Sequence, residues 1–209
     1  MREWFREAEM VENFERQELN DRLSMIESMI AEGRQATESW GWSFLLWGVA
    51  YYVAIGWSIW GRSNWAWPVT MTAAIVVTIA VATHRRQGRP GTTLGRAIGA
   101  VWKSMGISLS LLLMCLAISG KLEPQSSVAI VGAILGMANA ASSMILKWKM
   151  QFACALVWWA LAVFACFGNV NALTAAFLVA IFLCQIVFGI YAMVCESRRR
   201  QLMQGAANA

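Results

Sequence analysis

The side chains best placed to do chemistry within the apolar part of this chain carry no charge. Asn139, Ser142 and Ser143 fall within one apolar segment, and Gln185 falls within another. In hydrocarbon, such amides and hydroxyls either hydrogen-bond between helices or line a pocket for a polar solute. We favour interhelical hydrogen bonds, because Asn139 adjoins small residues at which two helices can approach closely. A polar pocket is the alternative.

Four aromatic side chains lie deeper in their segments than the membrane interface, where Trp and Tyr usually gather. They are Tyr51, Tyr52, Trp158 and Trp159. Rings at this depth can stack on a lipid, a quinone or a pigment, but filling space opposite small residues is their commoner role. We therefore expect no cofactor.

Ionisable groups that could drive transport or catalysis are missing from the apolar segments, apart from thiols, tyrosines and Lys103 at a segment end. An ion-coupled transporter or pump keeps a charged or titrating group at this depth. An intramembrane protease needs a Ser with a His base, two Asp residues or an HExxH motif. The single histidine, His84, lies at a segment boundary and is interpreted as a polar flank. The sequence therefore predicts no catalytic residues and no enzymatic activity.

Metal, nucleotide and nucleic-acid sites are not expected either. The five cysteines form no CxxC pair and have no histidine nearby, so they are interpreted as small hydrophobic residues. The sequence GRPGTTLG at 88–95 has the glycines of a phosphate-binding loop but lacks its lysine. The net charge of +5 comes from basic residues between apolar segments, which is typical of topology signals and not of nucleic-acid binding.

The composition indicates that a membrane surrounds these residues. Of 209 residues, 58% are hydrophobic and 14% are charged, whereas roughly a quarter of a soluble domain is charged. Six apolar runs are long enough to cross a bilayer as helices of about 20 residues. We expect an all-α polytopic bundle over residues 40–195, built as three hairpins from spans at about 42–60, 65–83, 98–119, 128–146, 151–167 and 172–195.

The fourth span, 128–146, is expected to be the main packing helix. Gly132, Gly136 and Ala140 recur every four positions, so they share one face of a helix. Small residues at this spacing form a groove in which a neighbouring backbone can lie close. The sequence thus predicts a helix-packing groove but does not identify the helix that fills it.

Residues 1–39 precede the first span and carry ten acidic side chains against five arginines. We expect one or two amphipathic helices, because apolar residues recur at the alternating spacing of a coiled-coil seam: Leu19, Leu23, Ile26 and Ile30. An acidic helix is poorly suited to anionic lipid. The seam therefore predicts docking onto a protein partner or a second copy of the chain. A solvated extension of the first span is the alternative.

Basic residues lie mostly on one side of the predicted spans. The loop after the second span carries Arg85, Arg86, Arg89 and Arg96, and fifteen of the 17 Lys and Arg residues fall on the side that holds both termini. The positive-inside rule then predicts that both termini lie on the cytoplasmic side of the inner membrane. The chain would end in a basic and then small polar tail at 196–209.

These observations favour a non-catalytic membrane protein that works by helix association. We expect an accessory, scaffolding or regulatory subunit surrounded by membrane lipid, whose acidic N-terminal segment docks to a partner or to a second copy. The alternative is an uncoupled channel or facilitator for a neutral or apolar solute, lined by the uncharged polar residues. No motif in the sequence identifies a family.

Overall fold

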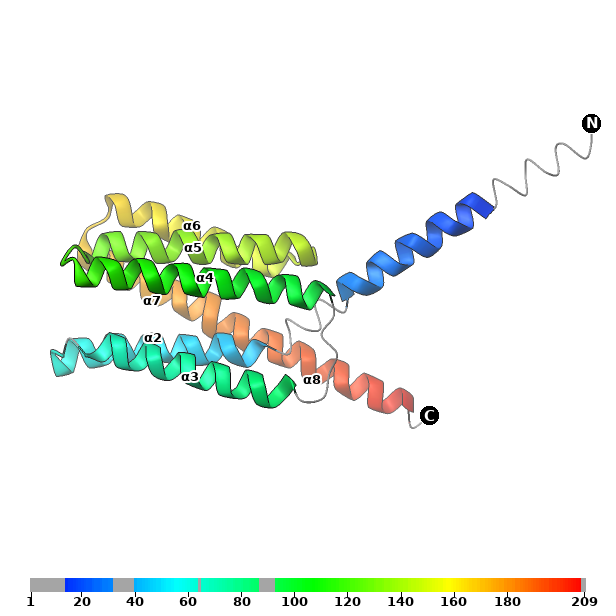
Figure 1. The fold of residues 1–209 in the computed structure, drawn as a ribbon, viewed down its shortest axis with the longest axis horizontal. Coiled ribbons are helices and arrows are strands. Elements are labelled where there is room, and N and C mark those ends of the chain that lie inside the picture. Colours follow the sequence, from blue (N-terminus) through cyan, green and yellow to red (C-terminus); the bar gives the residue numbers. More distant parts are fainter. Residues whose placement is uncertain (1–13, 32–39, 64, 87–92, 208–209) are drawn as a thin grey trace, which may run out of the picture.

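The computed structural model describes residues 14–31, 40–63, 65–86 and 93–207, and within these ranges the secondary structure is helical without strands. A helix over residues 14–31 precedes the bundle (Figure 1). The bundle consists of α2 (Gly41–Gly61), α3 (Ala66–Arg86), α4 (Thr93–Ile118), α5 (Pro124–Leu146), α6 (Lys149–Phe167), α7 (Val170–Ile181), the π-helix η1 (Phe182–Val187) and α8 (Phe188–Ala207).

Six of these helices are long and apolar enough to cross a membrane, which confirms the all-α, multi-pass fold class. Five of them are α2 to α6, and the sixth is the continuous rod formed by α7, η1 and α8. Helix α5 starts at Pro124, four residues before the predicted 128. Two other ends differ more from the sequence prediction. Helix α4 starts at Thr93, five residues early, and the last rod continues to Ala207 instead of ending near 195. The extension of the last rod contains Glu, Arg, Gln and Leu, which are good helix formers.

Local sequence explains where the central helices begin and end. Pro124 occupies the first turn of α5, where its missing N–H is no loss. Lys147 ends α5 in the left-handed conformation (φ 49°), and its backbone N–H bonds to the carbonyl of Ser143. Asn169 caps α7, since its side-chain oxygen accepts from the N–H of Ala172 at 2.8 Å. These signals fix the two short turns that flank α6.

The bundle is organised around α5. Its most extensive contact is with α6, while α4 covers another part of it. Helix α2 packs against α3 and against the last rod at η1 and α8. The predicted second hairpin is α4 with α5, and the predicted third hairpin is α6 with the last rod. The most extensive helix contact, between α5 and α6, therefore lies between these two hairpins and not within one of them.

Aromatic rings connect α2 and α6 to the last rod in the core. Phe44 meets Phe188 edge-on with ring centroids 5.1 Å apart, and Tyr51 meets Phe177 at 6.0 Å. Phe177 also contacts Trp158, whose side chain is completely buried. Edge-to-face contacts of this kind stabilise a core beyond the area they bury.

The helix over residues 14–31 extends away from the bundle and lies at the same end of it as the C-terminus (Figure 1). It runs without a break from residue 14 to residue 31, so this part of the segment is one helix. An exposed ion pair joins Arg22 to Glu18 at 2.5 Å, one turn apart. The remainder of the acidic segment, at 1–13 and 32–39, lies outside the described residues.

Candidate functional site

The predicted groove on α5 is occupied by α6 of the same chain. A Cβ atom at Gly132 would lie 2.8 Å from the backbone oxygen of Trp158 and 3.1 Å from the Cβ of Ala162. A Cβ atom at Gly136 would collide with the indole of Trp159. Ala140, the third groove residue, is 5% exposed. The groove is therefore an internal packing surface of the monomer.

The four polar residues singled out from the sequence are all buried. Asn139, Ser142, Ser143 and Gln185 are at most 4% exposed. A fifth buried polar residue, Gln151, is completely buried on α6. Gln151 is not among the polar residues expected from the sequence, because it lies two residues after Lys149, at the boundary of the predicted span.

Helical spacing was the signal that could have identified Gln151. The buried face of α6 continues from it at intervals of three or four residues through Cys154, Trp158, Leu161 and Ala165. A residue in phase with such a face points into the bundle even when it starts the helix.

Only one of the predicted polar residues makes a side-chain bond between helices. The Nε1–H of Trp102 on α4 donates to the hydroxyl of Ser142 on α5 at 3.1 Å. The hydroxyl of Ser143 donates to the carbonyl of Ala140 within α5, and the Nδ2 of Asn139 donates to the carbonyl of Leu135. Interhelical bonding therefore explains Ser142, whereas Ser143 and Asn139 bond within α5.

Several buried polar atoms have no hydrogen-bond partner among the described residues. They are Asn139 Oδ1, both amide atoms of Gln151, Gln185 Oε1 and Trp158 Nε1. Leaving a buried donor or acceptor unpaired costs about 1–3 kcal/mol each. We call the three residues with unpaired amide atoms, Asn139, Gln151 and Gln185, the amide layer.

The helix register places the amide layer in one zone of the bundle. Helices α5 and α6 are antiparallel, and Gly136 on α5 faces Trp159 on α6. One turn further along α5 therefore corresponds to one turn back along α6, so we infer that Asn139 lies at the level of Ala155 and Cys154. Gln151 lies one turn before Cys154 on α6. The thiol of Cys184 donates to the carbonyl of Cys154 at 3.7 Å, which brings η1 and its next residue, Gln185, to the same zone.

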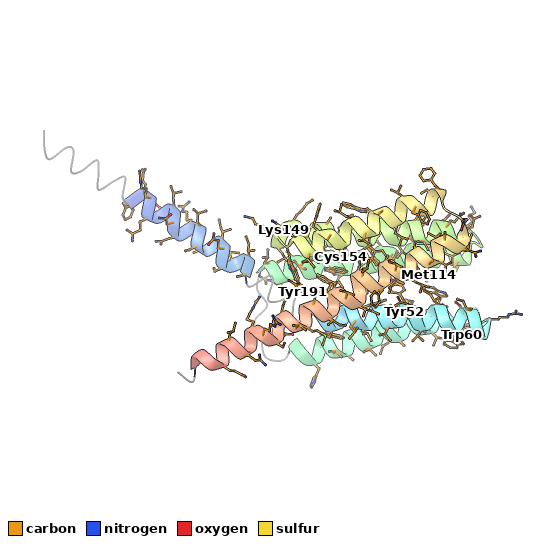
Figure 2. All side chains as sticks on the ribbon, turned by 180° about the vertical axis from the view of Figure 1, so that it is seen from behind. Tyr52, Trp60, Met114, Lys149, Cys154 and Tyr191 are labelled. Atoms are coloured by element: carbon orange, nitrogen blue, oxygen red, sulfur yellow. The ribbon has the colours of Figure 1, made fainter. Side chains whose placement is uncertain are left out.

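Helix α2 closes this zone from the other side. A Cβ atom at Gly48 would lie 3.0 Å from the Cβ of Gln185, so only a glycine lets the two backbones come this close. The hydroxyl of Tyr52, also on α2, donates to the carbonyl of Leu178 at 2.8 Å, just before η1. Figure 2 labels Tyr52 on α2 and Cys154 on α6, with the last rod running past both. A π-helix inside an α-helix is rare and is frequently found at functional sites.

The amide layer lies toward the end of the bundle that carries the turn between α5 and α6. Gln151 follows Lys149 by two residues, which is roughly 3 Å along the helix axis. The buried residues toward the opposite end are apolar: Val131, Leu161, Ala165 and Leu173.

The seam on the helix at 14–31 is exposed. Leu19, Leu23 and Ile26 are 60%, 57% and 52% exposed, and Ile30 is partly buried. Apolar side chains exposed along one line of a helix are typical of an interaction surface. This seam is the second candidate site.

The basic loop is described only in part. Arg85 and Arg86 end α3, although their side chains are outside the described set, and Arg89 is itself outside it. Arg96 is exposed in the first turn of α4. In the part of the chain that the structure describes, no three His, Cys, Asp or Glu residues are grouped closely enough to hold a metal ion.

Comparisons with protein-family models, with curated proteins and with solved structures found no match to this chain.

Proposed function

We propose that this protein is a non-catalytic membrane protein that works by association, as an accessory, scaffolding or regulatory subunit, and that its N-terminal helix docks onto a second copy of the chain. The observation that carries the proposal is the seam on residues 14–31, where Leu19, Leu23 and Ile26 are each more than half exposed. Most of the stability of a helix in a protein comes from packing of its apolar face, so an apolar partner face would stabilise this helix.

Charge complementarity supports a second copy as the occupant. With Leu23 at an a position and Ile26 at a d position of a heptad, Arg22 falls at g and Glu27 at e. In parallel coiled coils, g and e residues of the two chains form ion pairs across the seam. Each Arg22 would therefore face the Glu27 of the other copy, twice per dimer.

Membrane orientation supports the parallel arrangement. Two copies inserted the same way in one bilayer present their N-terminal helices on the same side. The positive-inside rule favours the cytoplasmic side of an inner membrane for both termini, because fifteen of the 17 Lys and Arg residues belong to that side. The N-terminal helix and the C-terminus lie at one end of the bundle, as this topology of three hairpins needs (Figure 1).

The experiment compares three variants with equal charge change. Leu23→Glu and Ile26→Glu place a carboxylate in the seam, while Met25→Glu alters an apolar side chain that is 64% exposed and lies at the outer c position. Particle mass in lipid nanodiscs or mild detergent is measured by light scattering after size exclusion. We expect the two seam variants to lose the dimer or higher oligomer and Met25→Glu to keep it. A wild-type particle that is already monomeric would refute the assignment.

A second candidate function is passive conduction of a neutral solute, and the amide layer is the observation that favours it. Hydrogen-bonding groups that line the pore are what select a polar solute in a channel. The buried residues at the far end of the bundle, Val131, Leu161, Ala165 and Leu173, are apolar, which favours association over conduction. Liposome flux abolished by Asn139→Leu or Gln185→Leu, with folding retained, would reverse this preference.

A further inference from the structure

The unpaired atoms of the amide layer include both hydrogen-bond acceptors and donors. The acceptors are the side-chain oxygens of Asn139, Gln151 and Gln185. The donors are Gln151 Nε2 and, one turn beyond Cys154 on the same face of α6, Trp158 Nε1. All four side chains are at most 4% exposed, so bulk solvent does not reach them.

The bundle itself offers these atoms no partner. Hydrocarbon outside the bundle has no hydrogen-bonding groups, so an unpaired polar group in a membrane protein must be satisfied from within. Two polar side chains of the neighbouring region, Trp102 and Ser142, bond to each other. A ligand held between α5, α6 and η1 is the remaining source of partners.

The chemistry of the lining defines the ligand. The amide layer carries no formal charge, and a desolvated ion needs a paired opposite charge. Amides and an indole offer hydrogen bonds in both directions, so the matching molecule also donates and accepts. Water is the smallest such molecule, and a buried water typically makes two to four bonds of this kind.

We propose that the amide layer is a binding site for a small uncharged molecule that donates and accepts hydrogen bonds, either water or a small polar solute. Gln151 contributes to it from α6, Asn139 from α5, and Gln185 from the π-helix. The π-helix sets the position of Gln185 at the point where Gly48 lets α2 approach. The site is independent of the seam on residues 14–31, so either proposal can fail without the other.

Hydroxyl-radical labelling tests the site in the full chain. X-ray pulses convert water to radicals that modify nearby side chains, and mass spectrometry locates the products. Cys154, Cys184 and Trp158 are reactive residues at the site, and all three are at most 9% exposed. The wild-type protein in nanodiscs is first equilibrated with H₂¹⁸O. We then expect all three residues to be labelled and the label to contain oxygen from this water. The buried apolar Leu173 and Val131, toward the opposite end of the bundle, serve as dry references.

Variants and a solute probe identify what is bound. In Gln151→Leu the affinity of the site falls by about tenfold, the change expected when one ordinary hydrogen bond is lost, and the label falls with the occupancy. Gln125→Leu is the matched control, since its amide bonds to the carbonyl of Gly168 at 2.8 Å in the opposite half of the bundle, and its label is unchanged. Urea that saturably reduces the wild-type label shows that the site takes a small amide solute, whereas no effect of urea shows that water is the occupant.

Wild-type labelling alone can overturn the proposal, even where a variant does not fold. If Cys154, Cys184 and Trp158 stay as unlabelled as Leu173, the interior is dry and no such molecule is bound. If folded Gln151→Leu is labelled as strongly as wild type, the amide layer does not hold the bound molecule, and the proposal is equally overturned.

Discussion

Adding one methyl group at Gly132 should destabilise the bundle, whereas the same change at the glycines of α4 should not. A Cβ atom there would lie 2.8 Å from the carbonyl oxygen of Trp158. Backbone cannot rotate away as a side chain can, so α5 and α6 would have to separate. Overpacking of this kind costs about 1–3 kcal/mol. The Ala substitution recovers about 0.5–1 kcal/mol of backbone entropy in a helix, so the net destabilisation is about 0–2.5 kcal/mol.

Two glycines on α4 provide the matched control. A Cβ atom at Gly99 or Gly106 has no heavy atom within 4 Å. Gly99→Ala and Gly106→Ala therefore gain helix propensity without a clash, and should stabilise the protein by about 0.5–1 kcal/mol. The predicted difference from Gly132→Ala is then about 1–3 kcal/mol, which is the clash alone.

Thermal or denaturant unfolding in one detergent, followed by circular dichroism and by a tryptophan signal, measures the order of the variants. We expect Gly132→Ala to unfold first, wild type next and the α4 variants last. Equal stability of Gly132→Ala and Gly99→Ala would refute the reasoning, because it would mean that α6 does not fill the groove on α5.

Three other predictions concern single contacts. Arg22→Glu or Glu27→Arg alone should weaken self-association through repulsion across the seam, and the double exchange should restore it, as measured by particle mass; weakening that persists in the double variant would argue against a parallel pair. Asn169→Ala removes the cap of α7 and should cost about 1 kcal/mol in unfolding experiments, and an unchanged midpoint would show that the cap is not formed. Trp102→Phe removes the bond to Ser142 and should cost about 0.6–1.7 kcal/mol; a double-mutant cycle with Ser142→Ala that gives no coupling would contradict this.

The spans and the groove could be predicted because both depend on local composition. Long apolar runs identify helices that can cross a membrane, and Gly132 and Gly136 at a spacing of four mark a surface of close approach. The helix that fills this groove could not be predicted. Small residues allow a close approach by any neighbour, and α6 was selected by packing over its whole length.

The amide layer was only half visible in the sequence for a different reason. Asn139 and Gln185 stood out because apolar residues surround them, whereas Gln151 was hidden by the adjacent Lys149. The π-helix around Gln185 left no sequence signal that we recognise. Gly48 on α2 is the residue whose role only the structure makes evident.

Helices α4 and α5 show why hydropathy predicts a span but not its position in the bundle. The most apolar 18-residue windows of the two helices have equal mean hydropathy, yet half of the α5 window is buried and none of the α4 window is. Lipid tails are as apolar as Leu, so hydrophobicity gives neither helix a preference for the interior. The small and polar residues of α5 permit close packing, whereas α4 exposes Ile107, Leu111 and Ile118. Contact geometry, and not hydrophobicity, therefore determines that α5 lies inside the bundle and α4 at its surface.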